Sequence, residues 1–154
     1  MDELDSALLA ALQADGRRSN RELAAQLGVA PSTSLERVRA LRGRGVLTGI
    51  HASVEPAAIG RPVQALVTIR LRPQSRAVIH GFRDFVAALP ETIQVFITTG
   101  PEDVLVHVAV PSTDALQNFV LDALTKRKEV AGIRTEVIFD HRRNHVIAPA
   151  SDTT

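Results

Sequence analysis

The fold is decided within residues 19–45, which read SNRELAAQLGVAPSTSLERVRALRGRG. Ser19 and Glu22 have the spacing of a capping box, which predicts that a helix begins directly after Ser19. Gly28 is a typical helix end, and Pro31 is well placed as the first residue of the next helix. The stretch therefore predicts two helices joined by a four-residue turn, which is the spacing of a helix-turn-helix.

A further helix is expected before this stretch. Apolar residues repeat at helical spacing from Leu4 to Leu12, and Asp15-Gly16 is expected to end the helix with glycine in a left-handed cap. The last helix of the region is expected from about Ser32 to Arg44. Its inward face is expected to carry Leu35, Val38 and Leu41, and its solvent face Thr33, Arg37, Ala40 and Arg44.

Composition indicates a folded protein whose charge is unevenly distributed. The 154 residues are 45% hydrophobic and 23% charged, which excludes a disordered linker protein. Cysteine is absent, which excludes disulfides, thiolate metal sites and cysteine nucleophiles. Residues 17–45 contain seven arginines and two acids, whereas residues 51–154 contain eleven basic and eleven acidic residues. A basic region beside a neutral one favours a polyanionic partner for the basic region.

The basic helix-turn-helix predicts binding to double-stranded DNA. The second helix of such a motif lies in the major groove while the first crosses the backbone. Hydroxyls and amides at the start of helix 32–44 can meet phosphates or base edges, Arg37 can reach a guanine, and Arg39 and Arg42 suit phosphates. Spacing alone leaves open a small helical bundle with a solvated arginine face. The predicted DNA contacts are Arg17, Arg18, Ser32, Thr33, Ser34, Arg37, Arg39 and Arg42.

The rest of the chain has a pattern of alternating strands and helices. Two short strands are expected at 46–50 and 51–54, before a linker that contains Pro56, Gly60 and Pro62. The order strand–helix–strand–strand–helix–strand then predicts a ferredoxin-like α+β domain, an antiparallel sheet with both helices on one face. Its strands are expected at 63–72, 92–99, 104–110 and 133–139, and its helices at 78–89 and 115–128.

The segment Leu35–Ile50, LERVRALRGRGVLTGI, is similar to the recognition helix and following strand of the Lrp/AsnC (leucine-responsive, or feast/famine) transcriptional regulators. Three later segments resemble the ligand-responsive domain of that family: Leu89-Pro90-Glu91, Thr99-Gly100-Pro101-Glu102-Asp103 and Val130-Ala131-Gly132-Ile133. The resemblance covers roughly residues 2–147. It implies a sequence-specific DNA-binding regulator with a winged helix-turn-helix and a βαββαβ domain that dimerises. It also implies assembly into tetramers or octamers and an amino acid, or a related metabolite, bound between dimers.

Four parts are therefore expected. They are a helix-turn-helix domain at 1–50, a linker strand and loop at 51–62, an effector-binding and oligomerisation domain at 63–147, and a flexible tail at 148–154. No apolar run approaches the ~18 residues of a membrane helix, and the acidic start MDELDSALL is unlike a signal peptide. A cytoplasmic protein with no membrane partner is expected.

Two positions depart from the family pattern. The family often has serine before the proline that opens the recognition helix, and this chain has Ala30. Loss of that cap typically costs ~1 kcal/mol of helix stability, unless Ser32 caps one register later. The last strand, Gly132–Val137, is one residue shorter than the family pattern and keeps a single threonine.

The loop before residue 104 is the predicted effector site. Thr98, Thr99 and Gly100 can donate to a carboxylate, and Asp103 can pair with an ammonium group. The alternative is an ordinary β-turn, for which Gly-Pro-Glu-Asp is typical. The predicted effector-binding residues are Thr98, Thr99, Gly100, Glu102, Asp103 and Thr135.

Other chemistry is weakly indicated. His141 and His145 are four residues apart, but they follow a strand, flank two arginines and lack a third ligand, so no metal is expected. No nucleophile, phosphate-loop or dinucleotide motif occurs, so neither an enzyme nor a cofactor is expected. The alternative function is a DNA-architectural protein that responds to no ligand.

Overall fold

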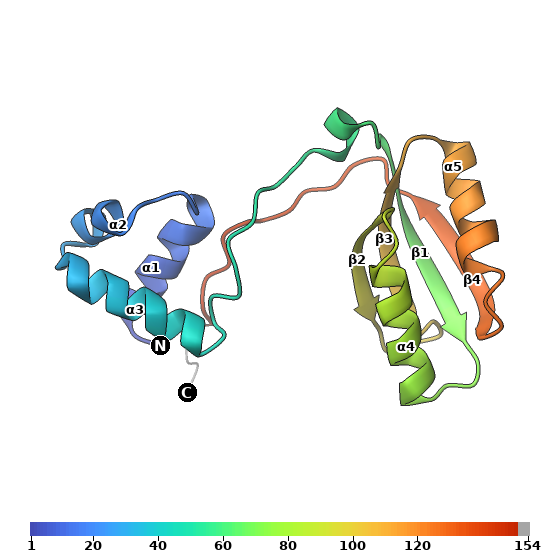
Figure 1. Ribbon diagram of the computed structural model, residues 1–154, viewed down its shortest axis with the longest axis horizontal. Coiled ribbons are helices and arrows are strands. Elements are labelled where there is room, and N and C mark those ends of the chain that lie inside the picture. The colour runs from blue at the N-terminus through green and yellow to red at the C-terminus, as the bar shows by residue number, and fades with distance from the viewer. Residues whose placement is uncertain (151–154) are drawn as a thin grey trace. The chain divides into compact units, whose positions relative to one another are not determined.

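In the computed structural model, residues 1–150 are described and the chain divides into two compact units (Figure 1). The first unit, which we call the head, comprises residues 1–53 together with the C-terminal residues from Arg142. The second, the body, comprises residues 54–141. Each unit has its own hydrophobic core. Within residues 1–150, no helix has the length and apolar character needed to cross a membrane.

The head, as far as it is described, contains the α-helices α1 (Glu3–Ala14), α2 (Asn20–Leu27) and α3 (Pro31–Gly43). The predicted capping box is present, since Ser19 Oγ accepts from the Glu22 amide and the Glu22 carboxylate accepts from the Ser19 amide at 2.7 Å. As predicted, α2 ends at Gly28, whose φ of 66° is left-handed. Leucines from all three helices form the core: Leu8, Leu12, Leu23 and Leu41.

Two helix ends differ from expectation: the end of α1, at Gly16, and the start of α3, near Ser32. Gly16 does not adopt a left-handed conformation, because α1 ends at Asp15 in an extended conformation. A Cβ on Gly16 would lie 2.5 Å from Cγ2 of Ile50, so a larger residue at position 16 would displace the Ile50 side chain. The N-cap of α3 is Ala30, without a side-chain hydrogen bond, and Ser32 does not replace it because Ser32 lies inside the helix.

The inward face of α3 also differs from the expected one. Leu41 is fully buried and Val38 packs against the core, but Leu35 is 39% exposed and Ser34 is buried in its place. Ser34, Val38 and Leu41 follow the i, i+4, i+7 spacing of a single helix face. The small serine lets α3 pack closely against its neighbours, and Leu35 consequently lies on the solvent side.

A buried carboxylate joins α1 to α3. Asp5 lies in the first turn of α1, with a side chain that is only 3% exposed. Its Oδ2 accepts from Arg44 Nη2 at 2.8 Å, and its Oδ1 accepts from Arg37 Nη1 at 3.4 Å. Arg37 also pairs with Asp2, the N-cap of α1. The Asp5 amide and the Arg37 guanidinium lower the pKa of the Asp2 carboxyl.

The two short strands expected at 46–50 and 51–54 are not formed. A strand needs a neighbouring strand to pair its backbone groups, and the described residues offer this segment none. The linker contains instead a short 3-10 helix, η1 (Pro56–Ile59), which ends at the left-handed Gly60.

The body has the predicted ferredoxin-like α+β fold. Its strands form one antiparallel sheet in the order β2-β3-β1-β4. β3 has the predicted limits, while the ends of most other elements differ by one to three residues. In chain order the elements are β1 (Val63–Leu71), α4 (Arg76–Ala87), β2 (Thr92–Ile97), β3 (Val104–Val110), α5 (Thr113–Asn118), η2 (Phe119–Leu124) and β4 (Val130–Val137).

The expected helix at 115–128 is interrupted by a wide turn. α5 passes into the π-helical segment η2, in which the Thr125 amide donates to the Val120 carbonyl at 2.9 Å. Phe119 and Leu124 are both buried although they are five residues apart, a spacing that would place them on different faces of a regular α-helix. The wider π turn keeps both side chains against the sheet.

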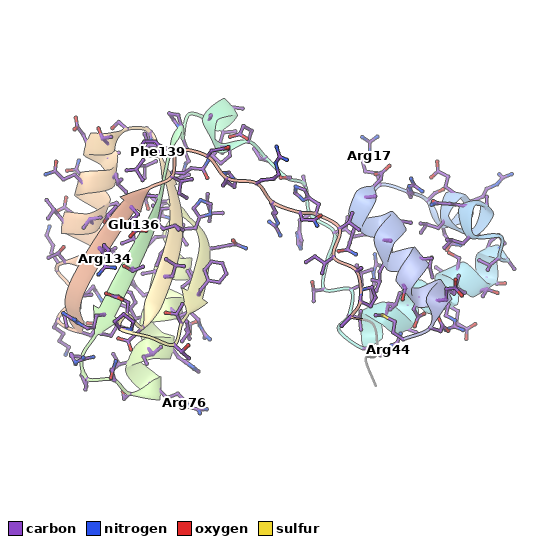
Figure 2. The ribbon with its side chains drawn as sticks, turned by 180° about the vertical axis from the view of Figure 1, so that it is seen from behind. Arg17, Arg44, Arg76, Arg134, Glu136 and Phe139 are labelled. Atoms are coloured by element: carbon purple, nitrogen blue, oxygen red, sulfur yellow. The ribbon has the colours of Figure 1, made fainter. Side chains whose placement is uncertain are left out.

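Helices cover only one face of the sheet (Figure 1). Alternate residues of β1, among them Val67 and Ile69, are buried on that face against α4 and α5. In the view from behind, the opposite face of the sheet lies toward the reader, with Arg134 and Glu136 of β4 projecting from it (Figure 2). No described element of the body covers this face.

Beyond β4, residues 138–150 contain no helix or strand. The segment from Arg142 belongs to the head, whereas a body boundary at residue 147 was expected. Within the head, the side-chain amide of Gln13 of α1 hydrogen-bonds both backbone groups of Ile147. Of the expected tail at 148–154, residues 151–154 lie outside the described part.

Replacement of Arg44 by methionine tests the role of the buried Asp5 carboxylate. Arg44→Met keeps the aliphatic stem and removes the closer of the two guanidinium groups. The free energy of unfolding of the head is expected to fall by about 1–3 kcal/mol, since a buried charged acceptor loses its main donor. Urea unfolding followed by circular dichroism measures the change, with Arg21→Met, on the exposed face of α2, as the matched control. Equal stability of the two variants would contradict the role given to Asp5.

Candidate functional site

Exposed arginines on the head mark a candidate nucleic-acid interface. Arg39 and Arg42 of α3 are exposed, and neither forms an ion pair with residues 1–150. Ser32 is exposed at the start of the same helix, where backbone amides without helical partners can donate to phosphates. Arg17 is exposed in the turn between α1 and α2, and its amide donates to the Asp15 carboxylate at 2.9 Å.

Three predicted DNA contacts are engaged within the head. Ser34 is fully buried and cannot reach DNA while α3 keeps this packing, because it occupies the inward face expected for Leu35. Arg37 was expected to reach a guanine edge, but its guanidinium is paired with Asp2 and Asp5. Arg18 is half-buried and hydrogen-bonds Gln26 of α2. Of the predicted DNA contacts on α3, Ser32, Arg39 and Arg42 are therefore exposed on its outer face, and Thr33 is half-buried.

Leu35 and Glu36 are also exposed on this outer face, and neither was predicted there from the sequence. The spacing of Ser34, Val38 and Leu41 could have indicated this, because it fits one helix face as well as the spacing of Leu35, Val38 and Leu41 does. Hydrophobicity alone favoured Leu35 over Ser34. The packing of α3 against the other helices decides between the two faces.

The loop between β2 and β3 is a tight turn with an exposed tip. The Thr98 amide donates to the Asp103 carbonyl at 3.0 Å, and the Thr98 hydroxyl donates to the Glu102 carbonyl at 3.0 Å. Gly100 has a φ of 140°, a conformation that favours glycine. Thr99 and Gly100 are exposed, so their polar groups remain accessible. The residues expected at an effector site from 98 to 103 are thus brought together by one turn.

Asp103 has a different role from the one expected. Its side chain was expected to pair with the ammonium of a ligand, but Asp103 is buried and both carboxylate oxygens accept from the chain itself. Oδ2 accepts from the Leu71 amide at 2.7 Å, and Oδ1 accepts from Gln74 Nε2 at 2.8 Å. Asp103 therefore fastens the β2–β3 loop to the end of β1.

Glu102 and Thr135 lie on opposite faces of the sheet. Oε1 of Glu102 lies 3.7 Å from Nη2 of Arg134 of β4. The register places Arg134 opposite Thr68, on the face of the sheet that no described helix covers, which we call the bare face. Thr135 is paired with Val67 and lies on the helix-covered face, where it lines a groove with Leu116. The structure therefore brings Arg134, and not Thr135, to the loop.

The bare face of the sheet has an apolar centre. The register places Leu66, Phe96 and Leu105 on this face, together with His107. Phe96 is 44% exposed, and Phe139, just beyond β4, is fully exposed (Figure 2). A hollow of 560 Å³ on this face is lined by His107 and His141, whose ring centroids are 6.0 Å apart. Burial, together with the nearby His141, lowers the pKa of His107.

Two family models match this chain. An AsnC-type helix-turn-helix domain matches residues 1–42, and an Lrp/AsnC ligand binding domain matches residues 64–146. The first match covers the helices of the head up to Arg42, and the second covers the sheet of the body and continues past it.

Relatives along almost the whole chain are transcriptional regulators. The HTH-type transcriptional regulator AldR of Mycolicibacterium smegmatis is 36% identical over 93% of this chain and 84% of its own length. The structure of AsnC from E. coli has a TM-score of 0.84 at 28% identity, covering 97% of this chain and 99% of that one. A Neisseria meningitidis transcriptional regulator solved in complex with L-Met has a TM-score of 0.86 at 25% identity, covering 97% and 96%. The chain belongs to the Lrp/AsnC family and is a DNA-binding transcriptional regulator with a ligand-binding domain.

Proposed function

We propose that this regulator binds operator DNA as a homodimer and that a small metabolite, an amino acid or a related compound, alters this binding through the β2–β3 loop. One observation carries the proposal: α3 presents Arg39 and Arg42 to solvent while Asp5 fixes the helix to α1. A rigidly held helix with exposed cations suits recognition of the major groove.

The proposed DNA contacts follow from exposure. The start of α3, with Ser32 and Thr33, meets base edges or phosphates, and Arg39 and Arg42 contact the duplex along the helix. Arg17 and Arg18, which precede α2, face the phosphate backbone. A dimer places two α3 helices about one DNA turn apart, or a multiple of it, so the expected operator is pseudo-palindromic.

Arg39→Ala and Arg42→Ala test the reading helix. Binding of a duplex from upstream of the protein's own coding sequence is measured over a series of salt concentrations. Loss of a phosphate contact is expected to reduce the salt slope by about one, whereas loss of a base contact costs ~1–3 kcal/mol and relaxes specificity. Arg76→Ala, at the exposed start of α4 in the body, is the matched control. Unchanged binding by both α3 variants contradicts the assignment of α3.

The bare face of the sheet is the proposed dimer interface. A sheet with helices on one side and with Leu66, Phe96 and Leu105 on the other exposes apolar surface of the kind that marks protein interaction sites. A second copy of the same face is self-complementary, as a two-fold interface requires. Dimers of this kind are proposed to assemble further, into tetramers or octamers.

His107 predicts that the dimer weakens in acid. Its pKa in the single chain lies below the ordinary value of 6.5. Burial by a second copy lowers this pKa further, so the free energy of dimer formation is complete above the His107 pKa of the monomer, which is itself below 6.5, and decreases as the pH falls through that pKa.

The dimer dissociation constant is therefore expected to rise between about pH 7.5 and about pH 5.5, as measured by analytical ultracentrifugation. His107→Gln is expected to lose most of this dependence. Glu136, Asp140 and His141 line the same hollow and are present in both proteins, so the difference between the two proteins reports on His107 and its interaction with His141. Equal pH dependence in the two proteins is the result that opposes a buried His107.

The proposed effector contacts are the exposed tip of the β2–β3 loop and the pair formed by Glu102 and Arg134. Arg134 can bind the carboxylate of an amino acid and Glu102 its ammonium, while the Thr99 and Gly100 amides add donors. The L-Met complex of the Neisseria meningitidis protein supports an amino acid as the ligand class. Asp103 supports the site by fixing the loop.

Thermal unfolding in the presence of each of the twenty amino acids at millimolar concentration tests the sensor. A ligand at 100 times its dissociation constant is expected to stabilise the native state by ~2.7 kcal/mol, which raises Tm measurably. Glu102→Gln is expected to abolish the shift, and Asp114→Asn, an exposed change in the first turn of α5, to leave it intact. No shift with any amino acid would favour the ligand-independent architectural protein.

A further inference from the structure

The C-terminal segment from Arg142 is bound to the DNA-binding head. The Gln13 side chain donates from Nε2 to the Ile147 carbonyl at 3.1 Å and accepts at Oε1 from the Ile147 amide at 2.9 Å. One side-chain amide thus satisfies both backbone groups of a residue 134 positions later. Residues 143–146, just before Ile147, are held across the C-terminal end of α1 by this pair of bonds.

A pocket of 700 Å³ lies between this segment and the end of α1. Arg17 and Arg143 line it together with His51 and His145, and Asp15 is its single acidic residue. The Asp15 carboxylate accepts from the Arg17 amide, and neither arginine forms an ion pair with residues 1–150. Arg17 and Arg143, from opposite ends of the chain, thus both line one pocket, and no carboxylate of residues 1–150 is paired with either.

We propose that this pocket binds a phosphate of the DNA backbone, so that the C-terminal segment forms part of the DNA interface. The inference rests on the proposed DNA binding of the head. Residues 142–150 contain two arginines and no acid, and they are held on the unit that carries α3. Arg37 and Arg44, by contrast, are engaged by acids of α1 and contribute less positive charge to a ligand.

The pocket fits a phosphate of a duplex better than a free anion. Its arginines and histidines are solvent-exposed, and attraction between exposed charges is weak and screened by salt. A free phosphate gains only this attraction. A backbone phosphate is presented repeatedly by DNA that α3 already holds, so a weak site adds measurably to the affinity and to its salt dependence.

Arg143→Ala in the full chain tests the phosphate site, with Arg142→Ala as the matched control. The control removes the same charge one residue away, outside the residues that line the pocket. Affinity is measured over a salt series for the upstream duplex and for a duplex of random sequence. Arg143→Ala is expected to lower the salt slope by about one for each bound head, and so by about two for the dimer, on both duplexes, because a phosphate contact carries no sequence information. Arg142→Ala is expected to change the slope much less.

Gln13→Leu tests the attachment of the segment. It removes both hydrogen bonds to Ile147 without changing any charge, and it is expected to reproduce the loss caused by Arg143→Ala. The double variant Gln13→Leu/Arg143→Ala is expected to bind DNA as either single variant does, since both changes act on one contact. If the double variant loses as much affinity as the two single variants combined, the proposal is overturned, because Arg143 would then contribute to DNA binding even when its segment is not attached to α1.

The outcomes separate this inference from the proposed function. No DNA binding by the unaltered protein overturns the proposed function. Binding that Arg143→Ala and Arg142→Ala weaken equally overturns only the pocket, because it shows general charge attraction. Inorganic phosphate that raises Tm of the unaltered protein but not of Arg143→Ala, while DNA affinity is equal in the two, assigns the pocket to a free anion and also overturns the proposal.

Discussion

The buried carboxylate of Asp5 decides which arginines of the head are available to DNA. It lies inside the head, and a charge in that position needs partners. Those partners are Arg37 and Arg44, which reach it from α3 and so fix the orientation of that helix against α1. The same contacts turn these two arginines away from a ligand. The side chains of α3 that Asp5 does not hold, above all Arg39 and Arg42, consequently remain available for the proposed contacts with DNA.

Asp103 has a comparable role in the body. Its carboxylate accepts from the Leu71 amide and the Gln74 side chain, and thereby ties the β2–β3 loop to the end of β1. In both units a buried acid holds a segment in place, and neighbouring residues are left free for the proposed binding. For the loop those neighbours are Glu102 and the exposed Thr99 and Gly100. An acid next to a functional segment is thus insufficient evidence that it contacts the ligand.

Features governed by neighbouring residues could be predicted from the sequence. The capping box at Ser19, the end of α2 at Gly28 and the strand Val104–Val110 depend on local propensity and period, and all three are confirmed. Features governed by distant partners could not. The close packing at Gly16 comes from Ile50, and the attachment of Ile147 comes from Gln13.

The same distinction applies to the candidate sites. Leu35 has the hydrophobicity of a core residue, yet Ser34 is buried because the packing of α3 selects the other helix face. Asp103 and Arg37 have the residue types of ligand contacts, and only the fold reveals the groups that already occupy them. The strands expected at 46–54 had strand-like composition but find no pairing partner within the described chain.

The charge balance of the head has a functional consequence as well. Residues 1–53 and 142–154 together contain nine arginines and seven acids, a small positive excess, so one head attracts DNA only weakly. In the proposed dimer, the second head binds its half-site at high effective concentration, which raises affinity without any new contact. A ligand that changes the proposed assembly of the body would then control DNA binding by the head.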